Sequence, residues 1–235
     1  MSTDPKTSLI SIVIPTLNEE NCLAVTLARL HGVDDLEVIV ADGGSNDLTV
    51  SLAEKAGVSV VRTGPGRGIQ QNAGAAAATG NILLFLHADT ILPEGFSNMI
   101  RESLDMREVI AGAFSLSIDM SGASIRFIEK AANWRSKWLQ LPYGDQALFM
   151  KAEVFRENGG FPEIAIMEDF VLMRALGKKG TIRTLPASVT TSGRRWQKMG
   201  ILRTTLVHQA MIIGYLVGRS PTSLANWYRR SSRAR

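Results

Sequence analysis

The fold is decided by LISIVIPTLNEE, residues 9–20, near the start of the chain. Its first six residues are an apolar run rich in β-branched side chains, and Pro15 closes the run, which predicts a buried strand. Thr16 and Glu19 stand at the spacing of a capping box, and an apolar-periodic segment follows them as far as Gly32. The stretch therefore predicts a strand, a short polar loop and a helix in direct succession.

The same alternation is repeated along the first half of the chain. Strands are expected at 36–41, 58–61 and 82–86, and helices at 45–55 and 69–79. Continuous apolar strands separated by helices indicate a parallel sheet that is covered on both faces. We therefore expect an α/β fold with a mostly parallel central sheet.

The second half of the chain is less regular. Helices are expected from residue 94 and at 123–138 and 168–176, and strands at 111–118, 147–150 and 181–185, before a long amphipathic C-terminal helix. No repeat or flexible linker separates these elements. We expect one domain over residues 1–193 and a basic helical extension over 194–235.

Composition sets the broad class of the protein. The chain has 235 residues, of which 45% are hydrophobic and 20% are charged, so it can bury a full core and is not expected to be disordered. The single cysteine, Cys22, cannot form an internal disulfide, and no segment resembles a secretory signal, so we expect a cytoplasmic location. No stretch approaches the roughly 18 uninterrupted apolar residues of a spanning helix.

Charge is distributed unevenly along the chain. Residues 194–235 carry nine Lys or Arg and no Asp or Glu, whereas residues 1–193 carry 17 basic and 22 acidic side chains. Such asymmetry indicates that the extension meets an anion, such as a diphosphate, a membrane surface or a nucleic acid. The alternative is that the last residues form a solvated tail.

Two familiar nucleotide motifs and zinc are excluded by spacing. The loop 64–68 lacks the glycine spacing of the dinucleotide fingerprint, and no Walker triplet is present. One cysteine and three scattered histidines give no zinc-ligand pattern.

Carboxylates at the ends of expected strands are the best candidates for chemistry, because ligands of such sheets bind beyond the carboxyl ends of the strands. Asp42 follows the second strand, where it can accept a hydrogen bond from a base or a ribose; alternatively it caps a helix or a loop. Asp89 follows the fourth strand, where it can hold Mg²⁺ or Mn²⁺; alternatively it satisfies a turn. His87 can orient Asp89, contact a diphosphate or serve the structure.

Two further groups lie in the second half. Glu168 and Asp169 begin a helix after the sharp turn at 159–162, a place where the helix dipole favours acids with or without chemistry. Arg194, Arg195 and Trp196 offer fixed charge for a phosphate and a flat apolar surface, or form an ordinary basic helix start.

These segments, taken in order, resemble glycosyltransferase family 2. The resemblance rests on residues 12–19 (IVIPTLNE), 41–47 (ADGGSND), 87–89 (HAD), 159–161 (GGF) and 168–169 (ED), and with 194–196 it covers roughly residues 9 to 196. Each motif is weak alone, but the ordered set is specific. The chain is most similar to small stand-alone bacterial members of the family, whose acceptors are mostly undefined.

The resemblance implies a GT-A fold, with a nucleotide-binding half over about 9–90 and an acceptor half over about 91–193. It also implies roles for individual residues. Pro15, Thr16 and Glu19 would line the nucleoside pocket, and Asp42 would bind the base, usually uracil. Arg67 and Asn72 would lie near the diphosphate, together with His87 and the segment Arg194-Arg195-Trp196. Asp89 would hold the metal, and Asp169, preceded by Glu168, would be the catalytic base.

The chain departs from the family pattern at two positions, since His87 replaces the first Asp of the metal motif and Gly43 replaces a frequent second Asp after the second strand. Fewer carboxylates weaken the expected affinity for the metal. The short extension makes processive polymer synthesis unexpected.

The resulting hypothesis is an inverting transfer from a nucleotide-diphosphate sugar, expected to be UDP-linked, to an unidentified lipid or small-molecule acceptor. Mn²⁺ or Mg²⁺ would bind Asp89, and Asp169 would be the general base. The alternatives are a sugar nucleotidyltransferase and a degenerate nucleotide-sugar-binding module. The amphipathic C-terminal helix suits a membrane surface at the inner face, a homodimer interface or the body of the protein equally well. We expect no nucleic acid partner.

Overall fold

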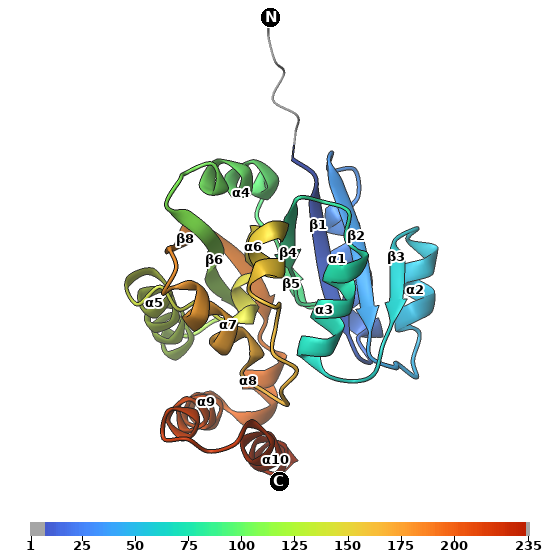
Figure 1. Cartoon of the computed structure of the whole chain (residues 1–235). Helices are drawn as coiled ribbons and strands as arrows, with labels where there is room; N and C mark the ends of the chain where they lie inside the picture. Colours follow the sequence, from blue (N-terminus) through green and yellow to red (C-terminus); the bar gives the residue numbers. More distant parts are fainter. Residues whose placement is uncertain (1–7, 234–235) are drawn as a thin grey trace, which may run out of the picture.

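One sheet of eight strands organises the molecule, in the order β3-β2-β1-β4-β7-β6-β8-β5 (Figure 1). The computed structural model describes residues 8–233, without the side chains of residues 195, 198, 202, 232 and 233. The sheet is mixed, because β7 runs antiparallel to both of its neighbours.

The first four long strands are parallel and form one half of the sheet. They are β1 (Ile10–Thr16), β2 (Leu36–Asp42), β3 (Ser59–Arg62) and β4 (Ile82–Phe85). Their register places Thr16 opposite Asp42, and Asp42 opposite Arg62. The loops that follow these strands therefore emerge at one edge of the sheet, as expected for parallel strands.

The second half of the sheet is built on two long parallel strands, β6 (Val109–Asp119) and β8 (Thr181–Ser192). β7 (Leu148–Lys151) joins β6 to β4, and the two-residue strand β5 (Thr90–Ile91) pairs with the end of β8. β8 continues seven residues beyond the strand that the sequence predicts, because its second part is paired along β6 as well.

Helices cover the sheet on both faces, as the sequence predicts. On one face, α1 (Glu20–Leu30) and α4 (Phe96–Leu104) bury apolar residues against Ile10, Ile12 and Ile14 of β1. On the other face, α3 (Arg67–Ala77), α6 (Ala152–Glu157) and α7 (Glu168–Leu176) pack against Val13 and its neighbours. The short α2 (Thr49–Lys55) lies beside β3, and α5 (Ala123–Trp138) lies beside β6 and is followed by the 3-10 turn η1 (Gly144–Gln146).

The C-terminal extension is three helices, which corrects the single long helix expected from the sequence. They are α8 (Arg194–Met199), α9 (Ile201–Leu216) and α10 (Pro221–Arg233). The breaks fall at Gly200 and Gly218, which have φ of +80° and +85°, a conformation that glycine adopts without strain. Among the helices of residues 8–233, none has the length and apolar character needed to span a bilayer.

The start of α1 also differs from the expectation. The N-cap residue, Glu19, makes no side-chain capping bond, and the Thr16 hydroxyl donates to Asp42. The predicted capping box is therefore absent, because Thr16 is still part of β1.

Candidate functional site

A cavity of about 590 Å³ opens beyond the carboxyl ends of β1 and β4. Its walls come from the end of β1, the start of α3, the start of α7, and the inner sides of α9 and α10. The sequence-predicted residues that line it are Pro15, Thr16, Glu19, Arg67, His87, Glu168 and Asp169. The structure thus brings together seven predicted site residues that are spread over more than half of the chain.

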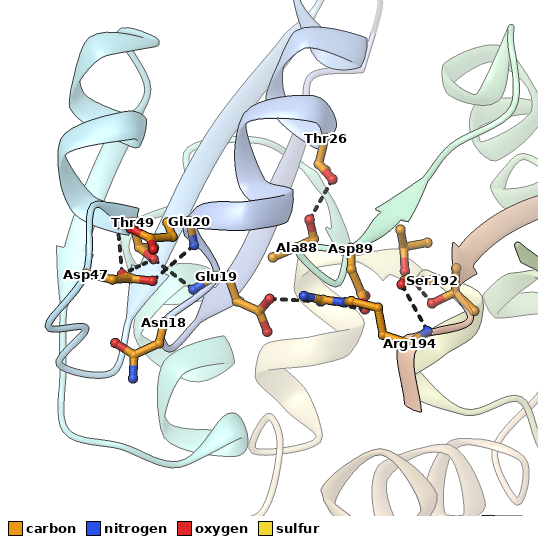
Figure 2. A network of polar contacts seen from close by, with 12 residues as sticks. Asn18, Glu19, Glu20, Thr26, Asp47, Thr49, Ala88, Asp89, Ser192 and Arg194 are labelled. Carbon is orange, nitrogen blue, oxygen red and sulfur yellow. Dashed lines mark hydrogen bonds and ion pairs between the residues drawn. The ribbon is translucent and has the colours of Figure 1, made fainter. Parts of the chain in front are cut away.

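The loop after β1 is fixed in position by the loop after β2 (Figure 2). The backbone N–H of Asn18 donates to the Ser45 hydroxyl at 2.9 Å. The backbone N–H of Glu19 donates to Thr49 Oγ1 at 2.8 Å. Glu20 adds a third bond from its N–H to Asp47. These bonds satisfy backbone donors that no helix cap satisfies, and they present the Glu19 side chain to the cavity.

Asp42 is buried in the loop that it begins and does not line the cavity. Its carboxylate accepts hydrogen bonds from the N–H groups of Gly44 and Ser45, both at 2.9 Å, and from the hydroxyls of Ser45 and Thr16. Burial opposes ionisation of this carboxyl, but the hydrogen bonds from Ser45, Gly44 and Thr16 outweigh it and hold the pKa below its usual range. Asp42 therefore orders the loop and, through Thr16, one wall of the cavity.

Gln70 is a cavity residue that the sequence analysis missed. Its buried amide donates to the carbonyls of Thr16 at 2.6 Å and Ala41 at 3.0 Å, which ties α3 to the ends of β1 and β2. The same amide explains Gly43, because a Cβ at this position would lie 3.0 Å from the Gln70 side chain. A side chain at residue 43 would therefore crowd the Gln70 amide.

Asp169 is held at the start of α7 by two backbone donors. Oδ2 accepts from the N–H of Gly144, and Oδ1 accepts from the N–H of Phe170, both at 2.7 Å. A Cβ at Gly144 would lie 3.2 Å from both Asp169 Oδ2 and His87 Nε2, so these two side chains are neighbours across that glycine. The carboxylate is therefore fixed in the cavity and retains lone pairs for a further proton or hydrogen bond.

Glu168 differs from Asp169 in its surroundings. It is buried, and desolvation together with the negative charge of Asp169 raises the pKa of its carboxyl, while Arg67, whose Nε lies 3.9 Å from Glu168 Oε1, opposes the rise. The preceding residue, Met167, has φ of +75°, a strained conformation for a residue with a side chain. The backbone turn that delivers the two acids to the cavity is therefore maintained by the surrounding packing.

Arg194 connects the C-terminal extension to the two loops (Figure 2). Its Nη2 lies 3.2 Å from carboxylate oxygens of both Glu19 and Asp89. Asp89 itself does not line the cavity, and its segment is held on α1 by a 2.6 Å bond from Thr26 to the Ala88 carbonyl. Asp89 and Arg194 therefore lie at the rim of the cavity, because Arg194 pairs both with Asp89 and with Glu19, which lines the cavity.

The side chains near Asp89 can bind a divalent ion only when a substrate supplies some of its ligands. Within residues 8–233 there is no group of three or more His, Cys, Asp or Glu side chains that could hold a metal ion. Mg²⁺ in proteins commonly uses one or two carboxylates together with phosphate oxygens and water, and Asp89 can supply one carboxylate. An ion that arrives with a diphosphate fits this donor set, whereas a permanently bound ion does not.

Three other predicted residues lie away from the cavity or outside the description. The Asn72 amide donates to the Phe161 carbonyl at 2.8 Å and accepts from the Phe161 N–H at 2.9 Å, so it joins α3 to the turn at 159–162. Trp196 is buried in an apolar cluster with Leu116 and Ile125, where it anchors α8. The side chain of Arg195 lies outside the described residues.

The sequence left open whether the C-terminal segment packs on the body of the protein, and it did not indicate that this segment covers the cavity. The cover includes Tyr143 and Asp145 near η1, His208, Met211 and Ile212 of α9, and Ala225, Tyr228 and Arg229 of α10. Met211 is buried against Met167 and Phe170 in one apolar cluster. The basic charge of the extension was a partial signal for Arg229, but no sequence pattern indicates that α9 and α10 fold over the start of α7.

Sequence comparisons identify relatives of the chain. A family model described as Glycosyl transferase family 2 matches residues 11–159. An uncharacterised glycosyltransferase of Mycobacterium tuberculosis is 34% identical over 87 residues, which are 37% of this chain and 39% of that protein. An uncharacterised protein of Methanocaldococcus jannaschii is 30% identical over 121 residues, or 52% of this chain and 48% of that protein. The chain thus spans about half or less of the length of these curated relatives.

Solved structures share the fold at low identity. The mannosyltransferase PcManGT from Pyrobaculum calidifontis, in complex with GDP-Man and Mn²⁺, has a TM-score of 0.67 at 18% identity, covering 97% of this chain and 70% of that one. Glucosyl-3-phosphoglycerate synthase from Mycobacterium tuberculosis, in complex with Mn²⁺, UDP and glucosyl-3-phosphoglycerate, has a TM-score of 0.62 at 21% identity, covering 86% and 79%. These likenesses confirm the fold class that the sequence predicts.

Proposed function

Because the chain belongs to glycosyl transferase family 2 and has the GT-A fold, we propose that it transfers a sugar with inversion from a UDP-linked donor to an acceptor hydroxyl. Membership of the family supports the transfer of a sugar; the donor, the stereochemistry and the residue roles are part of the same proposal. The observation that carries it is Asp169, a carboxylate fixed by two backbone N–H groups in the cavity that also contains the ends of the β1 loop and α3.

The donor occupies the side of the cavity formed by β1 and α3. Pro15, Thr16 and Glu19 form its wall there, and the Arg67 side chain at the start of α3 lies close enough to pair with a phosphate. Asp42, the predicted base-binding residue, also orders this side of the cavity, because its carboxylate accepts hydrogen bonds from Thr16 and from the loop on both oxygens. Asn72 supports the same helix by joining it to Phe161.

The reaction is a direct displacement at the anomeric carbon. The acceptor oxygen forms a bond to that carbon while the bond from the carbon to the diphosphate oxygen breaks, and Asp169 takes the acceptor proton. Attack from the side opposite the leaving group inverts the anomeric centre. His87, which neighbours Asp169 across Gly144, and Glu168 next to it position this carboxylate.

We assign two arginines to the negative charge that develops on the leaving group. Arg67 lines the cavity, and Arg194 spans Glu19 and Asp89 at its rim. Asp89 would hold a Mn²⁺ or Mg²⁺ ion brought with the diphosphate, and such an ion stabilises the charge that develops on the leaving oxygen. Arg195 and Trp196 follow Arg194 directly, and the buried Trp196 anchors α8, on which all three residues lie.

Location and partners follow from weaker observations. The single Cys22 favours a cytoplasmic location, and the acceptor is a lipid or a small molecule rather than a nucleic acid.

The test is the Asp169→Asn variant. Release of UDP from UDP-sugars should fall by about 10²-fold or more, as for loss of a general base, while calorimetry shows unchanged UDP affinity. Asp105→Asn, at the end of α4, is the matched control and should behave as the parent. Parent-like turnover by Asp169→Asn would reject the assignment.

A further inference from the structure

A second hollow adjoins the cavity on the side away from the donor. This groove of about 950 Å³ is lined by residues of α5, α7 and α9 and by Leu116 of β6. The groove and the cavity share five lining residues: Tyr143, Asp145, Phe170, His208 and Ile212. The groove therefore lies next to the cavity that contains Asp169, and these five side chains border both.

Large aromatic side chains surround the outer end of the groove. Phe127, Trp134 and Trp138 are spaced by seven and four residues, which puts them on one face of α5. These residues are 72%, 58% and 67% exposed, whereas large aromatic side chains usually contribute to a buried core. Leu139 and Leu216 extend the same exposed apolar rim. A cluster of exposed aromatic and aliphatic groups of this kind marks an interaction site.

The charges around the rim are basic. Lys130 and Lys137 on α5, and Arg174 and Lys178 at the end of α7, are exposed. The acidic residue of α5, Glu129, is buried and paired with Arg126. The sequence of the extension contributes no acid at all. This rim therefore matches an anionic partner.

Side chains on the inner wall of the groove are held by contacts with one another. The Arg135 guanidinium lies 3.4 Å from the centre of the Tyr143 ring, and its Nε donates to the Leu141 carbonyl at 3.1 Å. Tyr143 in turn packs on Phe170, next to Asp169. An elongated apolar ligand lying in the groove would thus have its end guided along Tyr143 and Phe170 toward Asp169.

We propose that the groove binds the hydrocarbon chain of a lipid acceptor that is taken from an anionic bilayer, with the acceptor hydroxyl placed in the cavity. The inference rests on the proposed function and names its acceptor class. Exposed tryptophans interleaved with lysines are the composition of a membrane interface. A second copy of the chain is disfavoured, because a two-fold pairing of this face would bring the basic rims together.

Vesicle binding by the full chain tests the surface. The parent should sediment with vesicles of phosphatidylcholine and phosphatidylglycerol at low salt, and pure phosphatidylcholine or high salt should weaken the binding. The double variant Trp134→Ala/Trp138→Ala should bind at least about tenfold more weakly, because two exposed aromatic anchors are lost. Val25→Ala/Leu48→Ala, which removes equally exposed apolar groups from the nucleotide half, is the control and should bind as the parent.

A chain probe tests the groove itself. Fluorescence of 11-(dansylamino)undecanoic acid should rise on binding the parent, and Ala131→Trp, which places a large side chain in the groove, should reduce the affinity of the probe at least about tenfold. All these variants should bind UDP and release UDP without acceptor as the parent does. If the parent itself neither binds UDP nor releases it from UDP-sugars, the proposed function is refuted instead.

Three results would overturn the lipid proposal. The first is that the parent does not bind vesicles. The second is that the two double variants bind vesicles equally well. The third is that the parent forms a concentration-dependent dimer, which Trp134→Ala/Trp138→Ala dissociates, and does not bind vesicles. The last result would assign the surface to self-association.

Discussion

The two sides of the cavity are built in different ways. On the donor side, the loops after β1 and β2 hold each other by hydrogen bonds between backbone N–H groups and short polar side chains such as Ser45, Asp47 and Thr49. On the acceptor side, α9 and α10 cover the start of α7 through apolar contacts such as those of Met211 with Met167 and Phe170. The donor side is therefore ordered by the local chain, whereas the acceptor side depends on a distant segment folding back.

This difference predicts that the two sides can be disturbed separately. Changes in the cover should alter the acceptor side without affecting nucleotide binding, and changes in the β1 and β2 loops should do the reverse. Asp169 lies between the two sides, so its position should be the most sensitive point of all.

The largest effect is expected for Gly144→Ala. The added Cβ would lie 3.2 Å from Asp169 Oδ2 and His87 Nε2, and displacing the carboxylate should lower turnover by about 10²-fold, the contribution of a positioned base. Steady-state UDP release measures the effect, and UDP affinity should not change. Gly177→Ala, where the Cβ meets nothing closer than 3.4 Å, is the control; equal turnover of the two variants would separate Gly144 from catalysis.

Met211→Ala should destabilise the cover. The side chain is buried between α9 and the start of α7, and its truncation should cost about 2 kcal/mol, a value at the low end for buried methionines. Hydrogen exchange should show faster exchange in α9 and α10 and unchanged exchange in β1 and β2. Uniform acceleration across the whole chain would contradict the separate construction of the two sides.

Asp42→Asn should destabilise the donor side by about 1.5 kcal/mol, because an amide nitrogen replaces an oxygen that accepts backbone N–H groups. The pKa of Asp42 is lowered, so its stabilisation is present at neutral pH and is lost as the pH falls below the usual value of 3.8 through the folded-state pKa. Urea denaturation at pH 7 and pH 3 should therefore show a smaller difference between variant and parent at pH 3. An equal difference at both pH values would refute this role.

The smallest effect is expected for Glu168→Gln. Burial and the Asp169 charge raise the pKa of Glu168, so its favourable, protonated state is fully present below the ordinary value of 4.5 and is lost as the pH rises through the folded-state pKa. The neutral Gln variant should gain stability relative to the parent between pH 4.5 and pH 8. The pairing with the half-exposed Arg67 at 3.9 Å offsets little of this gain. If Glu168→Gln is instead less stable than the parent at high pH, this account of Glu168 is contradicted.

The sequence predicts the donor half well for a physical reason. Strands of a parallel sheet are buried on both faces, so Ile10–Thr16 and Leu36–Asp42 appear as uninterrupted apolar runs, and the polar residues that follow them mark the binding edge. The helix Glu168–Leu176 was predicted with its bounds because the two acids and the preceding turn fix its start.

Tertiary packing decided what the sequence did not predict. Strand β5 has two residues and no periodicity of its own. The cavity residues Gln70, Tyr143 and Tyr228 come from three distant segments, and none lies in a motif. Asp42 was predicted as a base-binding residue, a role that stays a prediction, yet the hydrogen bonds that occupy it depend on the loop conformation, which the sequence pattern does not specify.

The stereochemistry of the first product tests the central claim most directly. The enzyme is given the UDP-sugar that raises its melting temperature most, with water as the acceptor, and the sugar released in the first minutes is observed by proton NMR. Direct displacement assisted by Asp169 predicts that an α-linked donor gives the β-anomer first and that Asp169→Asn gives almost none. Release of the α-anomer first, or undiminished release by the variant, would contradict the account.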